Sequence, residues 1–282
     1  MTILVTGITG QLGYDVSREL QERGYFVSSP NHNEMNIIDP VSVKERMFAE
    51  KPDIVVHCAA WTNVDLAEDE EGQCRAVNVD GTRNIVDCCK EMGIPIVYIS
   101  TDYVFKGDGT RPWKIDDPTE PQGVYARSKR DGELIVKQYP KHFIIRISWV
   151  FGINGKNFVK TMISLSKSKD SLNVVGDQIG SPTYTKDVAK LICDMIKTEK
   201  FGTYHACNTG YCSWAEFAGE IFRLTGANTV VNPISSDQWP SKVNRPKNSR
   251  MDTSSLTVNG FNQLPTWQDA LKRFIEEYSE ND

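Results

Sequence analysis

The chain has 282 residues, with 32 basic and 37 acidic side chains and a formal net charge of −5. This length allows one large α/β domain or two smaller lobes, and the charge balance lacks the strong basic excess usual for nucleic-acid binders. Seven cysteines without a Cys-x-x-Cys pair argue against a disulfide framework or a zinc site. We find no signal-peptide pattern and no apolar run near the ~20 residues that span a bilayer, so we expect a soluble, cytoplasmic protein without a membrane partner.

Short apolar runs rich in Val and Ile alternate with helical patterns. Most of these runs are apolar throughout, which is typical of strands covered on both faces. We expect helices at Gln11–Gln21 and Gly81–Met92 between them, and this alternation predicts an α/β fold with a doubly wound parallel sheet. The expected strands are Ile3–Thr6, Tyr25–Ser28, Ile54–Cys58, Ile96–Ser100, Phe143–Trp149, Leu172–Val175 and Thr203–Cys207.

A glycine-rich segment, "TGITGQLG", follows the first expected strand and opens the first helix. Glycines in this context let the backbone turn tightly and approach a pyrophosphate, and the helix N-terminus offers free N–H groups to the phosphates. The segment predicts a Rossmann-like dinucleotide site, whereas the alternative is a tight turn that binds nothing. The contacts expected here are Gly7, Gly10, Gln11, Leu12 and Gly13.

The end of the second expected strand bears on the choice of cofactor. It offers Ser28, Ser29 and Asn31, where a carboxylate would bind a ribose 2′-hydroxyl or an arginine would bind a 2′-phosphate. Neither group is present, so the sequence leaves NADPH and NADH open. The remaining cofactor contacts that we expect are Asn36, Ile37, Cys58, Ala59, Ala60, Asn78, Tyr125 and Lys129.

A hydroxyl, a phenol and an amine are spaced as carbonyl reduction requires. Thr101 ends the buried run "YIST", and Tyr125 stands four residues before Lys129, so that the last two share one helix face. In this set Thr101 orients the substrate carbonyl, Tyr125 protonates the developing alkoxide, and Lys129 lowers the pKa of the phenol and holds the nicotinamide ribose. The cofactor supplies the hydride, so this chemistry needs no metal.

The C-terminal part of the chain breaks the alternation. It contains a helix near Ser213–Leu224, a polar loop with several prolines, and a final helix near Trp267–Tyr278. We expect residues 1–150 to form the dinucleotide-binding core, with 185–210 returning to it. Residues 151–282 would mainly form a substrate-binding lobe over the carboxyl edge of the sheet.

Several segments together resemble one known family. The chain is similar to the dTDP-4-dehydrorhamnose reductases, within the extended short-chain dehydrogenase/reductase superfamily. The matching segments are "TGITGQLG", "AAWTNVDLAE", "VNVDGT", "STDYVFKG", "VYARSK", "RISWVFG", "NFVKTM", "GDQIGSPTY" and "RPKNSRMD". The first and fourth occur across the superfamily, whereas the last two are more specific to this family.

The resemblance implies an oxidoreductase that reduces the 4-keto group of dTDP-4-dehydro-L-rhamnose with NADPH or NADH. Some relatives bind magnesium through glutamates at a dimer interface, so a homodimer and Mg²⁺ are further expectations, although the sequence does not identify those glutamates. By analogy, the residues around the sugar are Val64, Asp65, Thr101, Asp102, Trp149 and Gln178, with Asn157 and Arg245 near the diphosphate.

Two of these implications have ordinary structural alternatives. Lys242, Arg245, Lys247 and Arg250 fall in a stretch without acidic residues, which suits a diphosphate, but two or more of them are expected to be solvated surface charges. Trp149 fits packing on the sugar ring and packing in the core equally well.

Two other functions compete with the reductase. An NAD-dependent sugar-nucleotide epimerase or dehydratase would share the glycine loop and the Tyr–Lys pair. The regulatory subunit of methionine adenosyltransferase resembles these reductases but acts as a binding partner. The complete set of Thr101, Tyr125 and Lys129 favours an active reductase.

Overall fold

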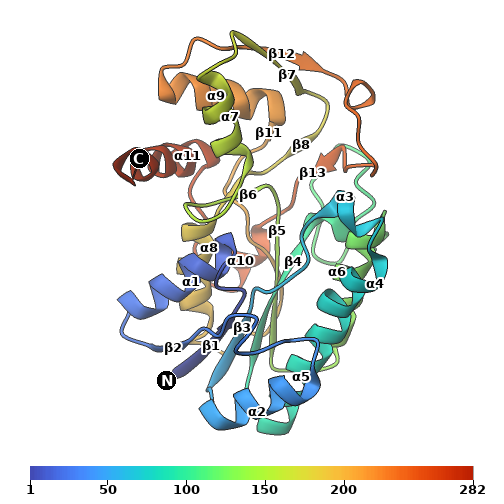
Figure 1. Ribbon diagram of the computed structural model, residues 1–282, viewed down its shortest axis with the longest axis vertical. Coiled ribbons are helices and arrows are strands. Elements are labelled where there is room, and N and C mark those ends of the chain that lie inside the picture. The colour runs from blue at the N-terminus through green and yellow to red at the C-terminus, as the bar shows by residue number, and fades with distance from the viewer. Residues whose placement is uncertain (282) are drawn as a thin grey trace.

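A six-stranded parallel sheet forms the centre of the computed structural model, which describes residues 1–281 (Figure 1). Its order is β10-β5-β4-β3-β1-β2, so the sequence order reverses between β1 and β3, where ligands of such sheets bind. The six strands lie within two residues of the predicted bounds. They are β1 (Thr2–Thr6), β2 (Phe26–Ser28), β3 (Ile54–His57), β4 (Ile96–Thr101), β5 (His142–Ile147) and β10 (Gly202–His205).

Helices cover both faces of this sheet. Those on one face are α1 (Gln11–Glu22) and α8 (Thr185–Met195), and those on the other are α2 (Pro40–Glu50), α5 (Thr82–Met92) and α6 (Val124–Lys137). Successive residues of β1 alternate between two buried cores, because Ile3 and Val5 pack with α1 and α8 while Leu4 packs with α2 and α5. The predicted α/β, doubly wound architecture is confirmed.

A second group of elements has its own apolar core, and Figure 1 shows it at the top of the molecule. We call it the lobe. It is built from α7 (Phe158–Ser166), β7 (Ser171–Val175), α9 (Trp214–Thr225), β12 (Val230–Ile234) and α11 (Trp267–Asn281). The two C-terminal helices that the sequence predicted are present. The expected strand at Leu172–Val175 also forms, but as β7 it pairs with β12 in the lobe and does not join the central sheet.

Short elements connect these parts. They are α3 (Val64–Ala67), α4 (Glu71–Arg75), the π-helical turn η1 (Ala76–Gly81), η2 (Asp102–Val104), β6 (Val150–Phe151), β8 (Ile179–Gly180), β9 (Thr183–Tyr184), β11 (Cys212–Ser213), η3 (Ser236–Gln238), β13 (Asn248–Ser249) and α10 (Ser254–Val258). None of the helices within residues 1–281 has the length and apolar character needed to cross a membrane.

Candidate active site

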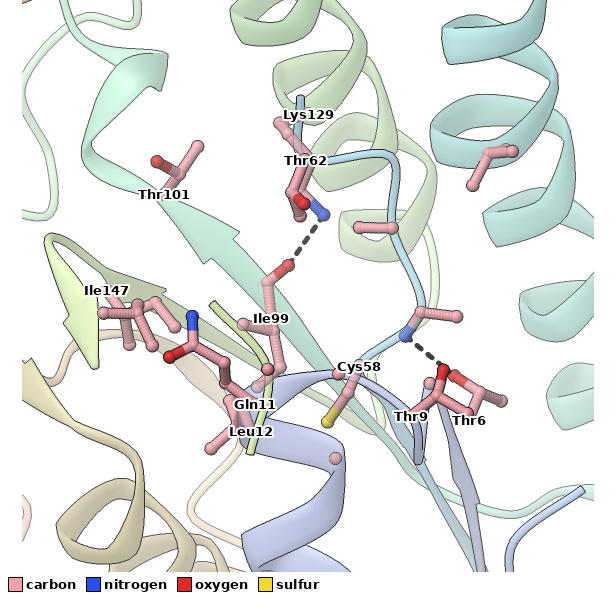
Figure 2. A pocket seen from close by; sticks show the side chains of 18 of the residues that line it. Thr6, Thr9, Gln11, Leu12, Cys58, Thr62, Ile99, Thr101, Lys129 and Ile147 are labelled. Atoms are coloured by element: carbon pink, nitrogen blue, oxygen red, sulfur yellow. Dashed lines mark hydrogen bonds between the residues drawn. The ribbon is translucent and has the colours of Figure 1, made fainter. Parts of the chain in front are cut away.

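The glycine turn between β1 and α1 is closed by backbone contacts that leave no room for side chains. A Cβ atom on Gly13 would lie 2.3 Å from the carbonyl oxygen of Gly7, and one on Gly7 would lie 2.6 Å from the backbone nitrogen of Ala59. The Thr6 hydroxyl accepts a 3.0 Å hydrogen bond from the same Ala59 nitrogen (Figure 2). Gly10 caps α1 without a side-chain hydrogen bond, so backbone N–H groups at the start of α1 remain for a ligand.

A cavity of about 880 Å³ opens beside this turn, at the carboxyl ends of the central strands. Figure 2 shows side chains from the glycine turn, the segment after β3, β4 and β5 around it. The cavity brings together most of the residues expected from the sequence. These are Gly7, Gly10, Gln11, Leu12, Gly13, Asn36, Ile37, Cys58, Ala59, Ala60, Val64, Thr101, Asp102, Tyr125, Lys129, Trp149, Asn157 and Arg245.

Three expected site residues lie outside the lining of this cavity. The buried side-chain amide of Asn78 accepts a 2.8 Å hydrogen bond from the Trp61 N–H and donates a 3.1 Å hydrogen bond to the Trp61 carbonyl. Asn78 therefore stabilises the segment after β3. Gln178 donates to the Ser236 hydroxyl in the lobe at 3.2 Å. Asp65 accepts a 2.7 Å hydrogen bond from the guanidinium of Arg245, so it contacts a residue that does line the cavity.

The three residues of the expected catalytic set meet at one end of the cavity. Tyr125 and Lys129 lie on α6, and Thr101 ends β4. The Thr101 hydroxyl donates to a carboxylate oxygen of Asp102 at 2.9 Å. Lys129 is buried and its Nζ donates to the backbone carbonyl of Ile99 at 2.8 Å, which Figure 2 shows as a dashed line.

The electrostatics of this set differ from the expectation. Burial raises the pKa of the Tyr125 phenol above its ordinary value, against the opposing effect of the nearby Thr101 hydroxyl. Burial also lowers the pKa of Lys129 to about 7. The shift of the phenol is opposite to the one that we expected from the Tyr-x-x-x-Lys spacing, because a spacing does not reveal burial. A phenol with a raised pKa keeps its proton at neutral pH, as a general acid must.

Sequence reasoning missed two aromatic residues of the cavity. Tyr103 lies two residues after Thr101, and its ring meets Tyr125 edge to face with centroids 5.7 Å apart. Its position two residues after Thr101 was an available signal. Trp214, at the start of α9, stacks on Trp149 with centroids 3.7 Å apart, and no local pattern connects these two tryptophans.

At least two residues of the basic stretch are surface charges, as expected. Lys242 pairs with Asp69 at 2.6 Å and Lys247 pairs with Asp177 at 3.3 Å, both at the surface. Of the four basic residues, Arg245 alone is among those that line the cavity. Within residues 1–281 no three His, Cys, Asp or Glu side chains are grouped closely enough to hold a metal ion.

Replacing Gly13 with alanine is expected to disrupt the turn. The new methyl group would clash with backbone atoms that cannot move away cheaply, so we expect a loss of about 1–3 kcal/mol of stability and weaker dinucleotide binding. Denaturant unfolding and a fluorescence titration with NADPH measure both effects. The control is Gly72→Ala, where no atom lies within 4 Å of the new Cβ in α4. Unchanged dinucleotide affinity in a folded Gly13→Ala protein would contradict this role of the turn.

Comparison with known proteins places the chain in a family. The family model described as RmlD substrate binding domain matches residues 1–280. The chain belongs to this family. This agrees with the resemblance found in the sequence, because relatives in the comparison carry the name dTDP-4-dehydrorhamnose reductase.

Three similar proteins illustrate the relationship. The spore coat polysaccharide biosynthesis protein SpsK of Bacillus subtilis is 40% identical, with 98% of each chain covered. A dTDP-4-dehydrorhamnose reductase of Streptomyces griseus is 38% identical over 95% of this chain and 91% of the relative. The crystal structure of dTDP-4-dehydrorhamnose reductase from Bacillus anthracis in complex with NADP has a TM-score of 0.96 and 40% identity, and covers 98% of this chain and 99% of its own.

Proposed function

We propose that this RmlD-family protein reduces the 4-keto group of dTDP-4-dehydro-L-rhamnose to give dTDP-L-rhamnose, by hydride transfer from NADPH or NADH. The observation that carries the proposal is the meeting of Thr101, Tyr125 and Lys129 at one end of a cavity that begins at the glycine turn. Relatives that align over nearly the whole chain bear the name of this reductase.

The cavity fits a dinucleotide at its glycine end. The start of α1 has no side-chain cap, and Cys58, Ala59 and Ala60 line the wall with small side chains. When bound, a reduced nicotinamide supplies the hydride. Asn31 and His32 also line the cavity near the end of β2, without a carboxylate that would repel a 2′-phosphate. NADPH and NADH are therefore both candidates, and the ratio of their kcat/KM values distinguishes them.

We assign the proton chemistry to Tyr125. Its phenol is protonated at neutral pH and donates its proton to the alkoxide oxygen that forms as the carbonyl is reduced. Thr101 orients the same oxygen with its hydroxyl. Lys129 holds the nicotinamide ribose from its buried position on α6.

We assign substrate recognition to the part of the cavity that faces the lobe. Arg245 offers a guanidinium for the diphosphate, and Asp65 holds that guanidinium in place. The side-chain amide of Asn157 donates a 3.0 Å hydrogen bond to the side chain of Gln11, at the start of α1. Asn157 also caps α7, so it lies beside both the glycine turn and the lobe. Val64, Asp102 and Trp149 are the remaining proposed sugar contacts in the lining, whereas Gln178 lies outside it and is proposed to act on the sugar site only from beyond these residues. On this proposal residues 1–150 form the dinucleotide-binding core, to which 185–210 returns, and the rest of 151–282 mainly forms the substrate-binding lobe.

The test is oxidation of NADPH and of NADH by the purified protein, with dTDP-4-dehydro-L-rhamnose generated in situ. We expect cofactor oxidation in step with formation of dTDP-L-rhamnose. A protein that binds the cofactor but oxidises none with this substrate would contradict the proposal. An epimerase would convert sugar nucleotides without net cofactor consumption, and a regulatory subunit would convert none.

A further inference from the structure

Trp149 holds an unusual backbone conformation at the wall of the cavity. Its φ is +48°, and among residues 1–281 only Lys51 shares a positive φ without being glycine. An L-residue in this region is strained, and such strain persists only where the surroundings impose it. The backbone carbonyl of Trp149 accepts a 3.1 Å hydrogen bond from the Thr183 nitrogen, which fixes the main chain between β5 and β6.

Two neighbours fix the indole of Trp149. Its ring stacks on Trp214 with centroids 3.7 Å apart and planes 12° from parallel. The backbone of Gly180 in β8 lies close to the indole of Trp149, and a Cβ atom on Gly180 would lie only 2.7 Å from that ring. Both the stack and the missing side chain are therefore needed for the ring to occupy this place.

Trp214 is itself anchored in the lobe. It is the first residue of α9, directly after Ser213, whose side chain and backbone form a capping box with Glu216. Its ring also contacts Phe158 of α7, with centroids 4.6 Å apart. The position of the Trp149 ring is in this way tied to the core of the lobe rather than to the central sheet.

We propose that Trp214, with Gly180, is a positioning residue that holds the Trp149 indole as a rigid wall of the sugar-nucleotide subsite. The inference rests on the proposed reductase function, because it assigns the wall to the sugar-nucleotide substrate. The strained backbone of Trp149 and its stacking on Trp214 of α9 hold the indole in one position before the substrate binds. Substrate binding then does not have to immobilise this side chain. Trp214 stacks on Trp149 and not on a residue of the glycine turn, so its loss is expected to spare cofactor binding.

The test compares Trp214→Ala, Trp214→Phe and Gly180→Ala with Trp239→Ala. Trp239 is half exposed and is not among the residues that line the cavity, so it is a matched control. In Trp214→Ala we expect KM for the sugar nucleotide to rise about tenfold or more. The dissociation constant for NADPH and the value of kcat should change little. Trp214→Phe should recover part of the affinity, and Gly180→Ala should raise KM while both indoles remain.

Circular dichroism provides a readout that does not depend on activity. Stacked indoles are expected to give an exciton couplet, which Trp214→Ala should remove and Trp239→Ala should retain. A folded Trp214→Ala protein without the couplet but with an unchanged KM would overturn the inference, as would a KM increase matched by an equal loss of NADPH affinity. A wild-type protein that shows the couplet but neither binds nor reduces the sugar nucleotide would contradict the proposed function, and the positioning role with it.

Discussion

Tyr125→Phe is expected to lower kcat about 10²–10⁴-fold while leaving the affinity for NADPH nearly unchanged. The substitution removes the hydroxyl and keeps the aromatic ring, whose edge-to-face contact with Tyr103 does not involve the oxygen. The proton for the alkoxide must then come from a less well placed donor. Steady-state kinetics with saturating NADPH, and a cofactor titration by fluorescence, separate the chemical step from binding.

A matched tyrosine controls for the loss of a phenol. Tyr139, two residues after the end of α6, donates a 2.9 Å hydrogen bond to the Ile94 carbonyl and does not line the cavity. We expect Tyr139→Phe to lower stability slightly and to leave kcat unchanged. If Tyr125→Phe kept more than about a tenth of the wild-type kcat, Tyr125 would not be the general acid.

Glu133→Gln is expected to lower the free energy of unfolding by about 3–5 kcal/mol. Glu133 on α6 and Arg146 on β5 are both buried and form a two-point ion pair, with nitrogen–oxygen distances of 2.8 and 2.7 Å. The amide cannot balance the guanidinium charge, which stays buried without its counterion. Urea unfolding measures the loss.

The control for Glu133→Gln is an ion pair at the surface. Glu220 pairs with Arg223 at 2.7 Å in α9, and the guanidinium is largely exposed. Glu220→Gln is expected to cost only about 0–1 kcal/mol. The double substitution of Glu133→Leu with Arg146→Met should recover part of the loss, because no charge is then left unpaired. A loss in Glu133→Gln no greater than that in Glu220→Gln would show that the buried pair contributes little.

Local patterns in the sequence predicted most of the fold and part of the candidate site. Buried strands and the glycine turn depend on residue types that are neighbours in the chain, so their bounds were predicted within two residues. Tyr125 and Lys129 were placed on one helix face for the same reason. The pairing of β7 with β12 was not predictable in this way, because an apolar run does not specify its partner strand.

Contacts between distant residues explain the remaining differences. The sequence did not show which of the four basic residues are surface charges, because Asp69 and Asp177, the partners of Lys242 and Lys247, are far away in the sequence. Trp214 meets Trp149 only once the lobe has folded. The direction of the Tyr125 pKa shift depends on the depth of burial, which no spacing of residues reveals.

The most direct test of the central claim follows the hydride itself. Wild-type protein is supplied with NADPH carrying deuterium at the transferable position of the nicotinamide and with dTDP-4-dehydro-L-rhamnose, and the sugar product is analysed by NMR and mass spectrometry. We predict a single deuterium at C4 of dTDP-L-rhamnose, with NADP⁺ formed in equal amount. A sugar product without deuterium, or conversion of the sugar without net oxidation of the cofactor, would contradict the reductase.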